Sequence, residues 1–257
     1  NGLAAYATDR FEVADKFVVS GGLRYSYNTL LSKFESQEFF AFPFEKAEQK
    51  SGALSGNLGV VYKPNSKIWL SLLGSTGYRT PNVDDLSKVF ESGGGILIVP
   101  NPNIKPEYAK NIEASVNWKP CSFFQIELNG FYTLLDNALG TAAFTFNNQD
   151  TILYDGDLSA VYATQNLGKA RIMGGYVGVL APFGKGFSLS AKLNYTKGTV
   201  DTDTTAAPLD HIPPMFGRLG LQYQKTKVQA EFWAAYSAAK KLADYSPSGE
   251  DNLPYAT

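Results

Sequence analysis

The chain has 257 residues, a formal net charge of −1 and only 18% charged residues. The near-neutral balance argues against nucleic-acid binding, which needs a clustered basic face, and the low charged fraction indicates that part of the surface does not face water. One cysteine, Cys121, excludes an internal disulfide, and one histidine, His211, excludes a multi-histidine metal centre. We expect no cofactor and no metal site. No apolar run approaches the ~20 residues of a membrane helix, so any membrane crossing must use strands.

Apolar and polar residues alternate strictly in successive segments, a pattern typical of β-strands whose two faces meet different surroundings. In segment 17–28, for example, Val19 and Leu23 share one face, whereas Ser20 and Arg24 share the other. Segment 170–180 is apolar on both faces, so its register is not assigned. The predicted strands, about ten in number, are 3–13, 17–28, 54–62, 68–79, 111–118, 124–134, 170–180, 187–196, 218–223 and 228–237.

The connections between these strands alternate between short and long. Tight turns are predicted at 14–16, 63–66, 119–122, 183–186 and 225–226, and long polar segments at 31–52, 80–109, 137–158, 201–214 and from 240 onward. Aromatic residues, such as Trp118 and Tyr195, lie near the strand ends, where the two boundaries of a bilayer would fall. The sequence therefore predicts an all-β fold, an antiparallel transmembrane β-barrel. A soluble β-sandwich or β-helix is the less favoured alternative.

Several short motifs resemble those of one family, and they occur in the order in which that family has them. The segment 77–82, G-Y-R-T-P-N, resembles the F-R-A-P-N signature of TonB-dependent receptors, and 101–107, N-P-N-I-K-P-E, is close to their N-P-x-L-K-P-E. Segments 21–25, 110–115, 165–170 and 212–218 resemble further family motifs, although Ser26 and Ser115 depart from the usual Asp and Gly. The motif residues are Arg79, Pro81, Asn101, Pro102, Pro106, Glu107, Asn166, Pro213 and Arg218, for which we expect structural or loop-anchoring roles.

The resemblance implies a fold and a location. A TonB-dependent receptor has a barrel of about 22 strands around a plugged lumen, so residues 1–257 would supply a part of one barrel domain. The plug domain with its TonB box is then expected before Asn1, and the last strands after Thr257. The implied location is the outer membrane of a Gram-negative bacterium, where the protein would be a monomer in contact with outer-membrane lipid.

The resemblance also implies a function. We expect energised uptake of a scarce and bulky nutrient, driven by the TonB–ExbB–ExbD complex through the plug. A ferric siderophore is the default small-molecule ligand, cobalamin and oligosaccharide remain open, and haem is disfavoured because a single histidine offers little axial ligation. Residues that we expect to face the ligand or the plug are Trp69 and Trp233 on the polar faces and Phe39, Phe40 and Phe42 in an apolar external loop.

Two other functions remain as alternatives. A passive porin would also have polar-inward and apolar-outward strands, but it would lack the motifs at 79–81 and 101–107. A ten-stranded outer-membrane protease would need acids clustered with a histidine, and His211 is the only candidate. We therefore predict no catalytic residues and no enzymatic activity.

Overall fold

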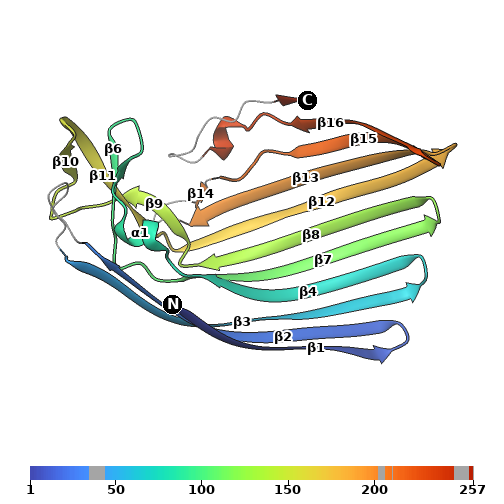
Figure 1. Cartoon of the computed structure of the whole chain (residues 1–257), viewed down its shortest axis with the longest axis horizontal. Helices are drawn as coiled ribbons and strands as arrows, with labels where there is room; N and C mark the ends of the chain where they lie inside the picture. Colours follow the sequence, from blue (N-terminus) through green and yellow to red (C-terminus); the bar gives the residue numbers. More distant parts are fainter. Residues whose placement is uncertain (35–43, 202–205, 210, 246–254, 257) are drawn as a thin grey trace.

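A computed structural model describes residues 1–34, 44–201, 206–209, 211–245 and 255–256. Ten long strands lie side by side and form a curved wall (Figure 1). They are β1 (Gly2–Ala14), β2 (Phe17–Lys33), β3 (Lys46–Asn65), β4 (Ile68–Arg79), β7 (Glu107–Cys121), β8 (Phe124–Asp136), β12 (Lys169–Gly184), β13 (Phe187–Asp201), β15 (Phe216–Lys225) and β16 (Val228–Ser237).

Every neighbouring pair of wall strands is antiparallel, and the strands follow one another in chain order. Two short strands extend this sheet: β14 (Ala206–Pro208) pairs with β13, and β17 (Tyr255–Ala256) pairs with β16. Within the described residues the two ends of the sheet do not pair with each other, so the wall is an open section of a barrel. These findings confirm the predicted antiparallel meander and its short turns.

The pairing register places the alternating residues as predicted. Leu23 lies opposite Gly56 and Arg24 opposite Ser55, so apolar residues share one face across neighbouring strands and polar residues share the other. The apolar face is uncovered: the exposed fraction is 63% for Leu23 and 75% for Phe232. A soluble sandwich would bury these side chains under a second layer. The wall therefore has the exterior of a membrane barrel.

The structure also resolves the strand whose register the sequence left open. In β12, Tyr176 lies opposite Asn129 of β8 and Asn194 of β13, both of which belong to the polar face. Val177 lies opposite Leu128, and it is therefore on the apolar face. The pairing partners on both sides therefore show which residues of β12 belong to each face, which the sequence of this strand alone did not show.

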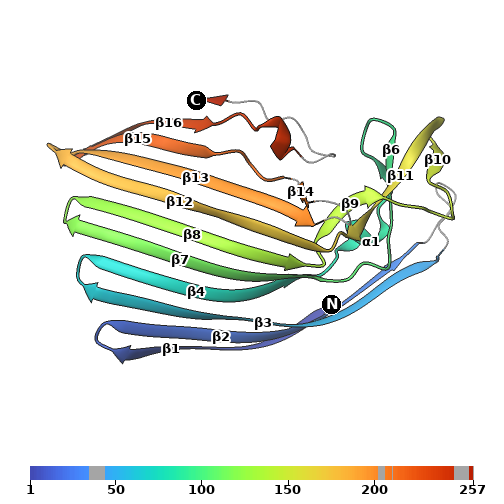
Figure 2. The ribbon, with the colours of Figure 1, turned by 180° about the vertical axis from the view of Figure 1, so that it is seen from behind.

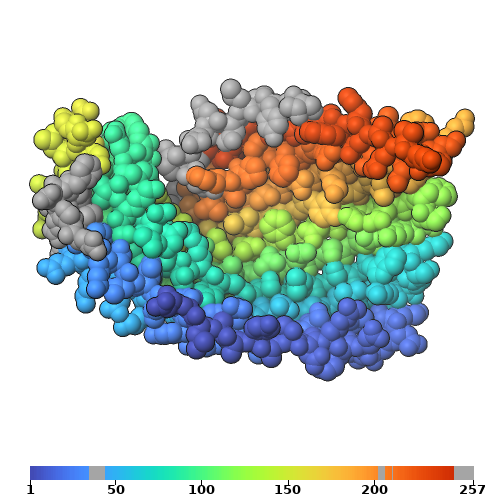
Figure 3. All heavy atoms as spheres, viewed as in Figure 1, coloured from blue at the N-terminus to red at the C-terminus, as the bar shows by residue number. Residues whose placement is uncertain are grey.

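The long connections contain more structure than predicted. The ladder between β2 and β3 continues to Lys33 and Lys46, where a polar loop was expected from residue 31 to residue 52. A second sheet, here called the loop sheet, contains β5 (Phe90–Glu91), β6 (Ile96–Val99), β9 (Leu139–Ala143), β10 (Thr151–Tyr154) and β11 (Asp157–Asn166). It lies beyond the wall at the end opposite the short turns (Figure 2) and projects as a separate lobe (Figure 3).

The loop sheet has its own hydrophobic core. Leu97, Val99, Phe146, Val161 and Ala163 are buried together. A short helix, α1 (Val83–Ser87), and a 3₁₀ turn, η1 (Leu242–Asp244), complete the described secondary structure. Among all the residues that the structure describes, no helix has the length and apolar character of a membrane span.

Candidate functional site

The long-loop end of the wall is where the chain builds a surface beyond the strands. A second buried cluster, made by Ala47, Leu86 and Ile104, packs with Leu30 and Leu139. This cluster joins α1 and the segment before β7 to the ends of β2 and β3 that lie at the long-loop end of the wall. The two longest loops are therefore docked on the rim of the wall and hold a defined shape there.

Two asparagines of the family motifs connect these loops. Asn101 is buried, and its Nδ2 donates to the carbonyl of Thr164 at 2.9 Å while its Oδ1 accepts from the backbone amide of Asn103. Asn166 bonds both backbone groups of Lys105, and its Nδ2 also donates to the carbonyl of Asn137 at 2.9 Å. Each side chain thus crosses between the connection from β4 to β7 and the connection from β8 to β12.

Glu107 makes a similar connection. Its Oε2 accepts a hydrogen bond from the backbone amide of Leu139 at 2.8 Å, and Asn137 Nδ2 donates to the carbonyl of the adjacent Pro106. Pro102 is half-buried between Asn101 and Asn103. A carboxylate that accepts from a loop amide fixes the point at which the chain leaves β8.

Arg79 lies at the end of β4, half exposed, and pairs with Asp85 at 3.1 Å. Asp85 also accepts from the backbone amide of Asn82, whose side chain accepts in turn from the Asp85 amide, so the two residues form a capping box at the start of α1. The arginine for which we expected a structural or loop-anchoring role thus has a carboxylate of the following loop as its partner. Pro81 is buried next to this cap.

An open hollow of about 750 Å³ lies on the polar face beside Arg79. Arg24, Ser26, Asn28 and Tyr78 line it as well. The Oη of Tyr78 accepts a hydrogen bond from Asn28 Nδ2 at 2.9 Å. The β3–β4 ladder ends at the Gly56–Thr76 pair, two residues before Tyr78. Two guanidinium groups and a phenol therefore face the same open space.

Trp69 and Trp233 lie on the polar face, each beside a cation. The Arg218 guanidinium is 4.6 Å from the centre of the Trp233 ring and pairs with Glu231 at 2.9 Å. Lys119 Nζ is 5.4 Å from the Trp69 ring. Cation–π contacts of this kind hold a ring on a water-accessible surface.

Hydrogen bonds connect neighbouring strands along the polar face. Asn129 donates to Glu113 at 2.8 Å, and Thr133 donates to Asn111 at 2.7 Å. The Glu127 carboxylate accepts from Tyr176 of the neighbouring β12 and from Gln125 of its own strand. The polar face is thus a hydrated, hydrogen-bonded surface of a kind that suits the interior of a wide barrel.

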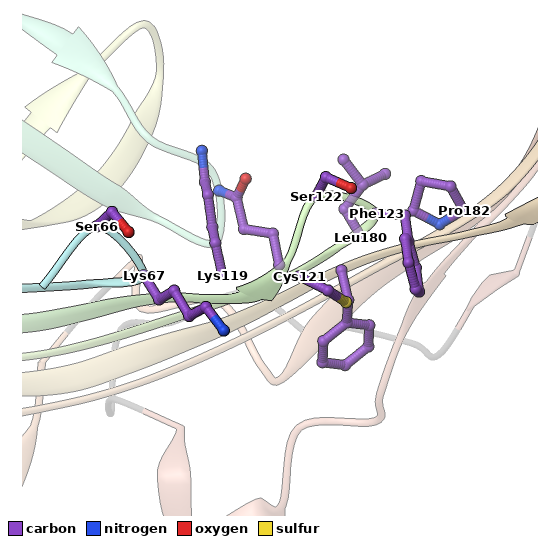
Figure 4. Close-up of a pocket in the computed structure, with 10 residues that line it drawn as sticks. Ser66, Lys67, Lys119, Cys121, Ser122, Phe123, Leu180 and Pro182 are labelled. Atoms are coloured by element: carbon purple, nitrogen blue, oxygen red, sulfur yellow. The ribbon is translucent and has the colours of Figure 1, made fainter.

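The opposite end of the wall has a smaller hollow, of about 340 Å³, between the short turns. Figure 4 shows Lys67 and Lys119, which line it, extending in different directions, and the half-buried Cys121 lines it as well. The hollow brings together no group of acids, histidines or further cysteines. Across the described parts of the chain, no cluster of three or more His, Cys, Asp or Glu is arranged to hold a metal ion.

The other predicted site residues are more scattered. Pro213 is exposed and lines a hollow between the connection from β13 to β15 and the segment after β16. His211 is exposed and has a left-handed backbone conformation, with φ of 60°. Phe39, Phe40 and Phe42 lie outside the described residues.

Sequence reasoning missed the loop sheet, although one signal pointed to it. Asp155-Gly156 lies between the alternating segments of β10 and β11, and both residues have positive φ, as a tight hairpin turn requires. The adjacent parallel pair of β6 and β11 has no local signal, because its strands come from different loops.

Comparison with known proteins agrees with this geometry. The family model "TonB dependent receptor-like, beta-barrel" matches residues 1–256. A probable hemoglobin and hemoglobin-haptoglobin-binding protein of Haemophilus influenzae is 27% identical over 211 residues, which are 74% of this chain and 20% of the relative. The chain therefore spans about one fifth of that relative's length.

Two solved structures show the same fold. A copper transporter, OprC, superposes with a TM-score of 0.80 at 17% identity, over 99% of this chain and 39% of its own. A variant of the ferric enterobactin receptor of Pseudomonas aeruginosa superposes with a TM-score of 0.68 at 17% identity, over 99% of this chain and 36% of its own. The uncovered apolar face, the polar face and the family match lead to one conclusion: this chain belongs to the TonB-dependent receptor β-barrel family, whose members lie in the outer membrane of Gram-negative bacteria.

Proposed function

We propose that the protein to which this wall belongs imports a scarce, bulky nutrient across the outer membrane by TonB-dependent active transport. A ferric siderophore or a similar complex is the substrate that we favour. Residues 1–257 would form a part of the barrel domain, and a plug and further strands would complete it. Energy would come from the TonB–ExbB–ExbD complex acting on the plug of a monomer.

The observation that carries this proposal is the arginine-lined hollow at the loop end of the polar face. Arg24 presents positive charge there, and Arg79 adds a half-exposed guanidinium that also pairs with Asp85. Asn28 and Tyr78 present hydrogen-bonding groups. The hollow is open, and the docked loops lie beside it. Such a surface suits an anionic complex that arrives from outside and is captured before transport. Complementary charge on a protein and its ligand raises both the rate and the specificity of their association.

The relatives support an iron source and leave its form open. One relative is described as binding hemoglobin and hemoglobin-haptoglobin, and one fold neighbour as receiving ferric enterobactin. This chain contains one histidine, His211. His211 is not among the residues that line the arginine-lined hollow. Carboxylate- or catecholate-rich iron chelates match the lining better than haem does, because arginine pairs well with oxyanions.

The test uses the full-length protein in an outer membrane that lacks other iron receptors. We expect uptake of ⁵⁵Fe from a panel of ferric siderophores under iron limitation, and a protonophore or deletion of TonB should reduce it to background. Uptake that continues without the proton gradient would instead indicate the passive porin. No uptake of any ferric siderophore, with growth restored by hemoglobin alone, would replace the favoured substrate class.

A variant pair tests the hollow itself. The double substitution Arg24→Gln/Arg79→Gln should raise the apparent Kd for the transported complex about tenfold or more, since charged hydrogen bonds contribute about 1.5–3 kcal/mol each. The matched control is Lys67→Gln/Lys119→Gln at the opposite end of the wall. Equal affinities of the arginine double variant and the wild type would remove the hollow from the proposal.

A further inference from the structure

A group of charged side chains lies on the outward, apolar side of the wall, immediately beyond the apolar band. The group contains four cations, Lys110, Lys169, Arg171 and Lys197, and two carboxylates, Asp136 and Asp201. Strand pairing brings them together: Lys169 lies opposite Asp136, Lys110 and Arg171 both lie opposite Leu134, and Lys197 lies opposite Met173. We call this set the outward cation cluster.

The face to which the cluster belongs follows from its neighbours. Ala170 and Val200, which alternate with the charged residues along β12 and β13, are buried on the other side of the wall beneath Leu167 and Leu209. Lys169, Arg171 and Lys197 therefore point outward, and all three are exposed. They share this outward face with Val177 and Tyr195.

An uncharged apolar band lies below the cluster on the outward face and covers most of the height of a barrel's lipid-facing band. On β12 the outward residues from Met173 to Ala181 include no charge, and on β13 the same holds from Phe187 to Tyr195. Eight residue steps of extended chain cover roughly 26 Å, and a strand tilt of about 35–45° reduces this to about 20 Å along the membrane normal, most of the ~25 Å apolar band of a barrel. The first charged outward residue after each band is a cation, Arg171 on β12 and Lys197 on β13. The cluster thus lies where lipid headgroups begin.

The cluster is only partly neutralised by its own acids. Lys110 Nζ pairs with Asp136 at 2.6 Å, and Arg171 pairs with Asp201 at 2.7 Å. In the part of the chain that the structure describes, Lys169 and Lys197 make no ion pair. Four cations against two carboxylates leave the patch positive, with two exposed ammonium groups available to a ligand.

From this placement we propose that the outward cation cluster binds the phosphate groups of an anionic lipid in the outer leaflet of the outer membrane. The short turns mark the periplasmic end of a barrel and the long loops the external end, so the cluster faces the outer leaflet. Tyr132 and Tyr195 lie one or two rows below it on the same face, as amphipathic rings do at a membrane boundary. Basic side chains at such a boundary bind acidic headgroups by charge, and lysine and arginine both bind phosphate.

The test measures binding of bis-phosphorylated lipid A to the purified full-length protein, by native mass spectrometry or titration in detergent. Each Lys or Arg near an anionic membrane surface contributes about 1 kcal/mol. The double variant Lys169→Gln/Lys197→Gln should therefore raise the Kd about 30-fold. The matched control, Lys185→Gln/Lys225→Gln, removes two exposed lysines from the short turns and should change the Kd by less than about twofold. Heat-modifiable migration in electrophoresis checks that each variant is folded.

A second variant changes the affinity in the opposite direction. Asp136→Asn removes a carboxylate from the cluster and should tighten lipid A binding several-fold. The proposal is overturned if the lysine double variant binds as the wild type does, if the control loses as much affinity, or if Asp136→Asn weakens binding. It is also overturned if lipid A stripped of both phosphates binds equally well, or if inorganic phosphate displaces lipid A at equal concentration, because the ligand would then not be a phosphorylated lipid.

Discussion

The wall and the loop sheet have the same alternation of apolar and polar residues, but they place the apolar side in opposite environments. In the wall, leucines such as Leu23 and Leu54 remain more than 60% exposed within the chain. In the loop sheet, Leu97 and Val161 are completely or almost completely buried in a local core. The wall uses lipid as the solvent for its apolar face, whereas the loop sheet must bury apolar surface as a small soluble domain does.

This comparison predicts that the two regions lose structure separately. Leu97→Ala leaves a cavity in the loop-sheet core and should cost that region about 2–5 kcal/mol. We expect faster proteolytic cleavage between residues 90 and 166 while the wall keeps its heat-modifiable migration. Leu153→Ala is the control, because Leu153 lies on the same sheet and is 70% exposed. Simultaneous loss of wall and loop sheet would show that they form one cooperative unit.

A charge introduced at the middle of the wall should distinguish its two faces. Leu128 lies on the apolar face and its neighbour Asn129 on the polar face, beside Glu113. Leu128→Lys should destabilise the folded barrel by about 2–4 kcal/mol, as lysine does at the bilayer midplane, whereas Asn129→Lys meets water and a carboxylate. Urea unfolding in lipid vesicles measures the difference. Equal costs for the two variants would contradict the assignment of the faces.

The connection between the two loops should weaken when Asn166 is truncated. Asn166→Ala removes three hydrogen bonds to backbone groups of Lys105 and Asn137 and leaves those groups without a partner, at a cost of about 1–3 kcal/mol. Faster amide hydrogen exchange in segments 101–106 and 137–143, with unchanged exchange in β7 and β8, is the expected result. Asn103→Ala is the control, since the Asn103 contact described above uses its backbone amide alone. Protection that stays unchanged in Asn166→Ala would contradict the predicted connection.

The smallest expected effect concerns pH at the outward cation cluster. The hydrogen bond from Lys110 lowers the pKa of Asp136 below its ordinary value of 3.8. A lowered carboxyl pKa adds stability above that ordinary value, and this stability is lost as pH falls through the folded-state pKa. Asp136→Asn should therefore lower the thermal midpoint slightly at pH 7 and not at pH 2. A difference that grows as the pH falls would have the wrong sign.

Much of the wall was predictable from the sequence because its rule is local. Side chains of a strand alternate between faces, and the lipid and water on the two sides impose different chemistry on each. The segment 68–79 has the predicted bounds as strand β4, and the turn before Phe124 lies as expected. Strands such as β3 run further than predicted, because beyond the membrane both faces meet water and the alternation that marks a strand disappears.

The candidate site was predictable only in part. The motif residues Asn101, Glu107 and Asn166 stood out by their order, but their partners, at Thr164, Leu139 and Lys105, could not be read from the chain. The partners of Asn101 and Asn166 lie more than 60 residues away in sequence. A hydrogen bond between two loops leaves no periodic signal in either loop.

The sequence by itself determined the strands, the two faces of the wall and the family, because each follows from neighbouring residues or from short ordered motifs. The tertiary structure alone decided the register of β12, the loop sheet with its parallel pair, the arginine-lined hollow and the outward cation cluster. Each of these brings together residues from different strands or loops. Their proximity depends on pairing across the sheet, and pairing partners at long range are chosen by the packing of the whole chain.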